Sequence, residues 1–509
     1  MKRTSRISLL FIFIIVAALA GILWPLMRRG FYISDDGEWM VIRLSAFYQS
    51  LADGQFPVRF LGRLNNSYGY PVANFLYPGF LYIGSILHFF GLSFVTSVKV
   101  ILVASVIGGS AWIYASLRRI YSVFASTLGT LAFIGSPYLL YDLYTRGSVG
   151  EVLAFLPASM GIYSIVAHKP LLFAIAVGGL IVSHNTLALL FLGVFVVFII
   201  TLGRWGFLRQ LLLGMGLAAF FWVPAIAEKQ YVRFDTVMVS NPMEYMLGFR
   251  TMWLAGLAGV LAGIFFLFGK VKKHEKITSV AFVLNTISLF FALPMSALFW
   301  SIHPVASLVQ FPYRMLAVAA LMTPWIVASV GEKFIRQKVI IIGVLLVILV
   351  LPAWYQLQKI SFVMREEGYY TTNEGTSTVA DEYMPKWVSV IPGNRAPERI
   401  IFHSGRGTVV YKYLNTQKVV AHVDVLEDSL LRLQNIYYPG WGITIDGKLV
   451  PVTYENPNGF MEVSISAGKH TVEAEFRETV MRFLADMVSV ISSIVLFIML
   501  LKGMKYQIK

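Results

Sequence analysis

Apolar segments of about 17 to 25 residues recur along this chain of 509 residues, and they constrain its fold more than any other feature. A single α-helix of that length crosses the hydrocarbon layer of a bilayer. Hydrophobic residues make up 57% of the chain and charged residues only 14%, whereas about a quarter of the residues in a soluble domain are charged. The sequence therefore predicts an all-α polytopic membrane domain.

The apolar segments predict about twelve transmembrane helices. They lie at residues 7–26, 95–117, 121–140, 149–167, 170–184, 186–203, 210–227, 251–269, 278–299, 313–331, 339–355 and 483–501. A further apolar run, at residues 75–92, is interrupted by Pro78, and we expect it to be re-entrant or to lie along the membrane. If it crossed the membrane, every later loop would change side, and the excess of Lys and Arg in the cytoplasmic loops would be lost.

The same charge pattern predicts that both the N-terminus and the C-terminus are cytoplasmic. The first apolar segment is longer than the roughly 7 to 15 residues of a signal-peptide core, so we expect an uncleaved span. The net charge of +15 does not indicate a nucleic-acid partner, because the basic residues lie in short links between apolar runs and form no stripe. The absence of cysteine excludes disulfides and thiolate metal sites.

The composition becomes polar and alternating after Tyr355. Asp446-Gly447 lies between two short strand-like segments, which predicts a hairpin turn. Residues 460–465 and 470–476 alternate in the same way. We therefore predict three parts: a transmembrane domain at 1–356 with a first outer loop at 28–94, an extracytoplasmic β-sandwich-like domain at 357–478, and a last transmembrane helix with a basic tail at 479–509.

Four polar clusters fall on the outer face in this topology, and they are expected to line one cavity. The clusters are Asp35, Asp36, Glu38 and Arg43; Arg146 and Glu151; Ser183, His184 and Asn185; and His303 and Pro304 with Gln310, Phe311, Pro312, Tyr313 and Arg314. Polar, non-helical backbone at membrane depth is tolerated where protein or a wet cavity covers it.

Carboxylates opposite arginines suit the transfer of a sugar from a lipid phosphate. The departing phosphate needs cationic stabilisation, and an acceptor hydroxyl needs a base. Asp36 is the first candidate for that base or for a metal ligand, so a divalent cation stays open. Arg146 and Arg314 are candidates for the lipid phosphate, because a guanidinium binds phosphate bidentately. Further catalytic candidates are Asp35, Glu38 and Glu151, and further substrate-binding candidates are Arg43, His184, Asn185 and Gln310.

Each cluster also has a purely structural interpretation. Glu151 can simply pair with Arg146, His184 can be a hydrogen-bonded residue at a helix end, and Asp35 can cap a helix that begins near Gly37. Aromatic residues near span ends, namely Tyr77, Tyr138 and Trp300, are predicted to form an interfacial belt. The coincidence of four clusters on one side favours the functional interpretation.

Ordered motifs along nearly the whole chain resemble one family. They are Asp36 with Arg43, residues 54–59, 68–71, 75–78, 144–147 with Glu151, 183–184, 310–314, and 438–441 with 446–447. The chain resembles bacterial multi-span proteins of the 6-pyruvoyl-tetrahydropterin synthase-related and YfhO-like group, which are similar to GT-C glycosyltransferases. The resemblance implies a bacterial plasma membrane, a polyprenyl-phosphate sugar donor, a glycan, lipid or protein acceptor on the extracytoplasmic side, and an essential acid matched by Asp36.

The chain departs from this family at Met40, where relatives often carry a histidine. Whether Glu38 substitutes for that histidine stays open. The pterin label implies no chemistry here, because the eight histidines form no visible zinc cluster. Two other functions also remain open: a transporter of a lipid-linked substrate, and a non-catalytic assembly or anchoring protein with a glycan- or protein-binding β domain.

Overall fold

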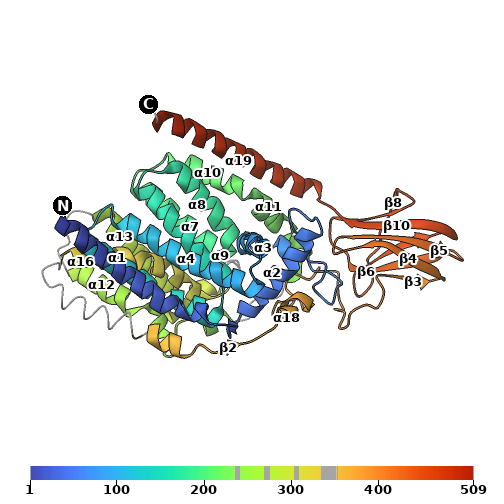
Figure 1. Cartoon of the computed structure of the whole chain (residues 1–509), viewed down its shortest axis with the longest axis horizontal. Helices are drawn as coiled ribbons and strands as arrows, with labels where there is room; N and C mark the ends of the chain where they lie inside the picture. Colours follow the sequence, from blue (N-terminus) through green and yellow to red (C-terminus); the bar gives the residue numbers. More distant parts are fainter. Residues whose placement is uncertain are drawn as a thin grey trace.

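The computed structural model describes residues 2–235, 241–268, 275–302, 309–333, 351 and 353–507. Within these residues the protein consists of a helical bundle, a β-rich region and one long final helix (Figure 1). The β-rich region extends from one end of the bundle, and the final helix runs back along the bundle's side (Figure 1). The predicted combination of a helical membrane part with a C-terminal β part is therefore confirmed.

Most of the described helices precede the β-rich region along the chain, and the last helix follows it. The helices are α1 (Lys2–Leu23), α2 (Gly37–Ala52), α3 (Gly79–Phe89), α4 (Phe94–Leu117), α5 (Val123–Ile134), α6 (Pro137–Tyr141), the π-helical η3 (Asp142–Arg146), α7 (Val149–Val166), α8 (Pro170–Ser183), α9 (Asn185–Thr201), α10 (Phe207–Leu217), α11 (Ala219–Glu228), α12 (Leu257–Phe268), α13 (Glu275–Ala292), α14 (Ala297–Trp300), α16 (Leu316–Lys333), α18 (Glu367–Thr372) and α19 (Val480–Gln507). The strands are β1 (Phe31–Tyr32), β2 (Phe362–Val363), β3 (Ile400–Ser404), β4 (Gly407–Leu414), β5 (Lys418–Val425), β6 (Ser429–Ile436), β7 (Trp441–Ile445), β8 (Lys448–Val450), β9 (Phe460–Ile465) and β10 (Gly468–Phe476).

Six helical segments among the described residues are long and apolar enough to cross a membrane, or up to eight if each of two bent helix pairs is one span. They mark a membrane protein, but the prediction of about twelve spans is not confirmed. Helices α8 and α9 contain 14 and 17 residues, fewer than the about 20 that a span usually needs. The span predicted at residues 339–355 lies mostly outside the described residues.

Serine caps define the beginnings of two of the long helices. The Ser93 side chain accepts a hydrogen bond from the Thr96 amide at the start of α4, and Ser122 accepts one from Ala125 at the start of α5. Such caps satisfy amide donors that have no partner within the helix. The run at residues 75–92 contains only the 11-residue helix α3, which spans roughly 16 Å and is too short to cross the bilayer alone.

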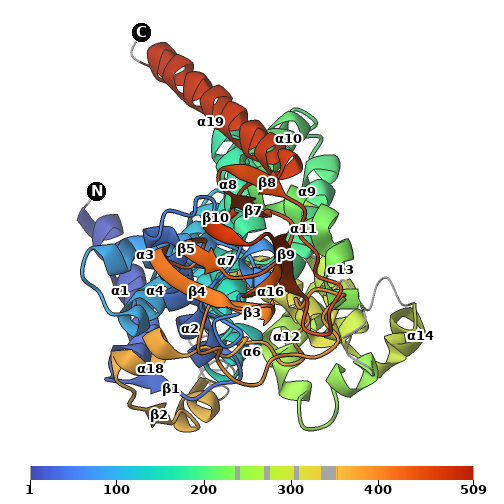
Figure 2. The same ribbon diagram turned by 90° about the vertical axis from the view of Figure 1, so that its right-hand side faces the viewer.

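The β-rich region contains two antiparallel sheets, with strand orders β4-β5-β10-β7-β8 and β3-β6-β9. Alternate residues of β5 and β6 are buried, so the two sheets enclose a core of side chains such as Val423, Leu433 and Trp441. The predicted turn at Asp446-Gly447 is confirmed, because both residues have positive φ between β7 and β8. Figure 2 shows these sheets in front of the helical bundle. The proposed division into three domains stays a prediction.

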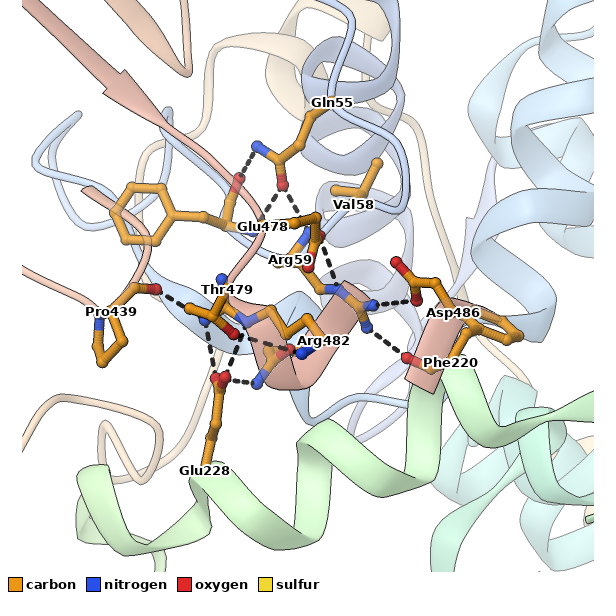
Figure 3. Close-up of polar contacts among 12 residues, drawn as sticks. Gln55, Val58, Arg59, Phe220, Glu228, Pro439, Glu478, Thr479, Arg482 and Asp486 are labelled. Carbon is orange, nitrogen blue, oxygen red and sulfur yellow. Dashed lines mark hydrogen bonds and ion pairs between the residues drawn. The ribbon is translucent and has the colours of Figure 1, made fainter. Parts of the chain in front are cut away.

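The loop between α2 and α3 inserts into the β core. The Phe60 ring is fully buried and stacks on Phe476 at a centroid distance of 5.2 Å. The neighbouring Arg59, which is 2% exposed, pairs with Glu478 at 3.2 Å and with Asp486 of α19 at 2.9 Å (Figure 3). One loop therefore joins the helical bundle, the β core and the final helix.

A second buried ion pair lies beside the first (Figure 3). Both nitrogens Nε and Nη2 of Arg482 donate to the Glu228 carboxylate at 2.8 Å. Tyr438 and Asn74 donate to the same carboxylate at 2.7 and 2.8 Å. Arg482 belongs to α19, Glu228 ends α11 and Tyr438 follows β6, so this cluster fixes the β-rich region against the bundle. A buried charge is tolerated when it is paired and hydrogen-bonded in this way.

Candidate active site

Glu151, in the first turn of α7, is a fully buried carboxylate at which several distant segments meet. Its Oε1 accepts hydrogen bonds from Arg146 Nη1 and, at 3.0 Å, from Arg314 Nε. Its Oε2 accepts a hydrogen bond from Tyr138 at 2.9 Å. His184 Nε2 lies 3.6 Å from Oε1. Glu151 therefore orients both arginines that the sequence singled out.

The π-helical turn η3 aims Arg146 at Glu151. The turn ends at Gly147, whose left-handed φ of 64° suits glycine, and a Cβ there would collide with Ser34. The amides of Asp35 and Asp36 donate to the carbonyls of Thr145 and Arg146 at 2.9 and 2.8 Å. These two bonds hold the loop before α2 against the turn.

Asp36 therefore lies at the edge of the arginine pair. Its Oδ2 is 3.7 Å from Arg146 Nη2, and its side chain is 29% exposed, whereas the Glu151 side chain is 0% exposed. Of these two carboxylates, only Asp36 is open to an incoming molecule. This difference separates a group that can take a proton from a group that holds the site together.

The segment before α16 supplies Arg314 and an aromatic cover. Arg314 Nη1 donates to the Val309 carbonyl and to Gln310 Oε1, at 3.0 and 2.7 Å. The Phe311 ring centroid lies 4.7 Å from Arg314 Cζ and 5.6 Å from Arg146 Cζ. The Tyr313 ring stacks on Phe311 and is also 5.6 Å from Arg146 Cζ. Such cation–π contacts shield guanidinium groups without neutralising them.

His184 caps α9 and faces Glu151 with its other nitrogen. Nδ1 accepts a hydrogen bond from the Leu187 amide at 3.2 Å, so in the neutral ring the proton lies on Nε2. The Tyr77 ring centroid is 4.7 Å from the His184 ring. Asn185 donates to the Phe75 carbonyl at 3.0 Å, which fixes the segment that carries Tyr77.

Two predicted site residues point to other partners. The Glu38 carboxylate accepts from Tyr370 at 3.1 Å and pairs with Arg365 at 3.4 Å. The Arg43 guanidinium donates to the backbone and side chain of Ser377. Both residues therefore fasten residues 365–377 to α2. His303 and Pro304 lie outside the described residues.

The interpretation of Tyr77, Tyr138 and Trp300 as an interfacial belt is wrong, because their exposed fractions are 6%, 1% and 3%. Burial raises the pKa of Tyr77, and the charges of Arg43, Asp36, Glu151 and Arg314 also act on it. Tyr77 therefore lies within electrostatic range of four predicted site residues. Its position beside an Asn-Phe-Leu-Tyr-Pro break was the signal that could have found it.

Asp142 was also missed. It is fully buried, and its Oδ1 lies 3.2 Å from Arg146 Nη1. The four-residue spacing between the two side chains was visible in the sequence and is typical of a helical ion pair. Asp142 belongs to the support of Arg146.

One nitrogen of each guanidinium makes no hydrogen bond to a described residue, although Arg146 Nη2 forms the 3.7 Å ion pair with Asp36. Within the part of the chain that the structure describes, Arg146 Nη2 and Arg314 Nη2 donate no hydrogen bond. Neither is a buried orphan donor. Guanidinium nitrogens can bind a phosphate group. A carboxylate next to them can accept a proton from the hydroxyl group of a second molecule.

The divalent cation considered from the sequence has no obvious binding site. Among the described residues, no group of three His, Asp or Glu side chains is placed to hold a metal ion. Asp36 instead faces the positive charge of Arg146.

Comparisons with known proteins give a weak structural likeness. No protein-family description matches the chain, and no curated protein matches it in sequence. The solved structure of the arabinofuranosyltransferase AftD from Mycobacteria is similar at a TM-score of 0.48 with 16% identity, over 68% of this chain and 26% of AftD. ArnT from Cupriavidus metallidurans, bound to undecaprenyl phosphate, is similar at a TM-score of 0.33 with 12% identity, over 64% of this chain and 77% of ArnT.

The chain thus spans about a quarter of the length of AftD. TM-scores below 0.5 do not establish a shared fold or a shared activity. The grouping with YfhO-like and 6-pyruvoyl-tetrahydropterin synthase-related proteins stays a prediction, because no family match supports it.

A glycine substitution tests the packing of the site. A Cβ at Gly150 would collide with the Tyr77 ring and lie 2.6 Å from the Ser183 carbonyl. Gly150→Ala should therefore destabilise the protein by about 1 to 3 kcal/mol. Gly193→Ala in α9 is the control, because a Cβ there would have no other group within 4 Å, and alanine should stabilise that helix by up to about 1 kcal/mol. Thermal unfolding in detergent measures both, and equal shifts would contradict the packing.

The pH dependence of stability tests the placement of Asp35. Partial enclosure raises the pKa of Asp35, the charge of Asp36 raises it further, and Arg146 lowers it. Because the folded-state pKa lies above the unfolded value of about 3.9, the ionised form of Asp35 costs stability at neutral pH. Asp35→Asn should therefore raise the melting temperature at pH 7, and the gain should vanish below about pH 4. A loss of stability at pH 7 would contradict the assignment.

Proposed function

We propose that the protein is a membrane glycosyltransferase, which moves a sugar from a polyprenyl-phosphate donor to an acceptor on the extracytoplasmic side of a bacterial plasma membrane. The observation that carries the proposal is the partly exposed Asp36, which pairs with Arg146 Nη2 at 3.7 Å, while Arg146 and Arg314 are both held by the buried Glu151. Asp36 can accept a proton, and the arginines can bind an anion. These are the two functions that sugar transfer from a phosphate needs.

The reaction is a displacement at the anomeric carbon of the donor sugar. The acceptor hydroxyl attacks that carbon and gives its proton to Asp36, while the bond between the carbon and the phosphate oxygen breaks. The electron pair leaves with the polyprenyl phosphate, and Arg146 and Arg314 stabilise its negative charge. Preorganised charges of this kind act strongly in a site from which water is excluded.

Glu151 has a positioning role in this proposal. It is fully buried and already accepts hydrogen bonds from both arginines and from Tyr138. It therefore sets the distance and direction of the two cations, as a supporting group does for a preorganised site. His184 and Asp142 contribute to the same support.

The proposal names neither the sugar nor the acceptor, because the geometry of the site does not specify them. AftD is named an arabinofuranosyltransferase, and ArnT was solved with undecaprenyl phosphate. Those activities are theirs, and the weak likeness adds no support for a particular sugar here. A transporter or an assembly protein remains the alternative. An assay of sugar transfer distinguishes an enzyme from both.

Asp36→Asn tests the proposed base. The full-length protein in nanodiscs is supplied with polyprenyl-phosphate sugars and bacterial envelope glycans, and release of polyprenyl phosphate is measured. Loss of the base should lower turnover by about 10²- to 10⁴-fold, while donor binding and the melting temperature stay near those of the unchanged protein.

Asp424→Asn is the matched control, because Asp424 is a partly buried carboxylate on β5 outside the candidate site. It should leave turnover unchanged. Turnover of Asp36→Asn equal to that of the unchanged protein would remove the mechanism, and export of labelled lipid without sugar transfer would favour the transporter.

A further inference from the structure

Four partly exposed aromatic side chains from separate segments gather where the β-rich region meets the bundle. They are Tyr231, Trp387, Tyr437 and Tyr454. Tyr437 and Tyr454 are stacked, with ring centroids 4.0 Å apart and an interplanar angle of 11°. Trp387 lies 5.3 Å from Tyr454 and 5.9 Å from Tyr437, and Tyr231 lies 6.3 Å from Trp387. We call these four residues the aromatic platform.

Hydrogen bonds to backbone carbonyls join the segments that carry the platform residues. Trp387 Nε1 donates to the Tyr437 carbonyl at 3.2 Å, and the Lys386 amide donates to the Tyr231 carbonyl at 2.9 Å. Gly459 has a φ of 66°, and a Cβ there would lie 2.9 Å from Trp387 Cδ1. Gly459 therefore makes room for the Trp387 ring of the platform.

The buried Glu228 cluster adjoins the platform along the chain. Glu228 is three residues before Tyr231, and Tyr438, which donates to Glu228, follows Tyr437. The ion pair between Glu228 and Arg482 thus anchors the segments that carry two of the four aromatic residues (Figure 3). A preorganised surface loses little entropy when a ligand binds.

The tyrosine hydroxyls of the platform are free to bind a ligand. Within the described residues, the hydroxyls of Tyr231, Tyr437 and Tyr454 make no hydrogen bond with another protein group. Burial raises the pKa of Tyr437, and the neighbouring Tyr454 and Tyr231 raise it further. The platform therefore offers partly exposed aromatic rings together with three groups that can donate or accept hydrogen bonds.

We propose that the aromatic platform binds a sugar ring of a glycan, by stacking on the ring faces and hydrogen bonding to the tyrosine hydroxyls. A sugar presents apolar C–H faces and hydroxyl groups side by side, which matches rings that carry free hydroxyls. An acyl chain would leave these hydroxyls unpaired, at a cost in free energy. The charged residues directly adjacent to the platform in the sequence, Lys386 and Glu455, are of opposite sign and do not form a basic patch.

The proposal rests on the proposed glycosyltransferase function, which supplies a reason for a glycan acceptor to reach this face. Tyr383 links the platform to the candidate site, since it lies four residues before Trp387 and stacks on Phe75 at 5.4 Å. Phe75 lies two residues before Tyr77, which contacts His184. The segment that carries Trp387 is therefore joined to the candidate site through the contacts of Tyr383, Phe75 and Tyr77.

Binding of defined glycans tests the platform without catalysis. The full-length protein in nanodiscs is applied to an array of arabinan, mannan, galactan and peptidoglycan fragments, and dissociation constants are measured for the fragments that bind. Trp387→Ala should weaken binding by about tenfold or more, as for a central aromatic contact. Tyr454→Phe keeps the ring and removes only the hydroxyl, so it should produce a smaller loss with an unchanged melting temperature.

Tyr413→Ala is the matched control, because Tyr413 on β4 is 50% exposed and lies outside the platform. It should bind glycan normally. Absence of binding to every fragment, or equal binding by Trp387→Ala and the unchanged protein, would overturn the proposal. Glycan binding by a protein that never transfers sugar would instead overturn the proposed function and leave the platform intact.

Discussion

The candidate site depends on the ion pairs and the hydrogen bond of the buried Glu151 carboxylate. An uncompensated charge at a fully buried position is costly, and here two arginines and a tyrosine hydroxyl compensate it. Because Arg146 comes from η3 and Arg314 from the turn before α16, their pairing with Glu151 joins segments more than 160 residues apart. The same pairing leaves Arg146 Nη2 beside the more accessible Asp36, at 3.7 Å from its carboxylate.

A second set of buried ion pairs extends this organisation to the rest of the chain. Arg59 and Arg482 connect the first loop, α11 and α19, because Arg59 also donates to the Phe220 carbonyl in α11 and Arg482 donates to the Pro439 carbonyl before β7. The loop that carries Arg59 also supplies Phe60 to that core, so charge pairing and apolar packing act at one junction. This junction fixes the aromatic platform and the segment that leads to Tyr77. The site and its surroundings are therefore positioned by two separate sets of paired charges.

The membrane class, the β part and much of the site followed from local patterns. Loop charge placed Asp36, Arg146, Glu151, His184 and Arg314 on one face, and the structure brings these five side chains together. The hairpin at Asp446-Gly447 followed from turn chemistry alone. The number of spans was harder to predict, because some apolar segments form helices that are short, such as α8, or bent, such as α10 with α11. The length of an apolar segment does not then show whether it crosses the membrane.

Pairings between distant residues could not be predicted. Glu38 and Arg43 look like members of the site, but their partners are Tyr370, Arg365 and Ser377, which lie more than 320 residues away. Tyr77 and Tyr138 looked like belt residues, because a sequence shows that an aromatic residue is near a helix end and not which way it faces. Glu228 and Arg482 carry no local motif, and only the packing of α19 against α11 brings them together.

An experimental structure of the full-length protein with a bound polyprenyl phosphate tests the central claim most directly. The account predicts phosphate oxygens about 3 Å from Arg146 Nη2 and Arg314 Nη2, with Asp36 on the open side of the phosphate and Glu151 still bonded to both arginines. A phosphate bound away from these two guanidinium groups, or arginines that face opposite sides of the membrane, would contradict it.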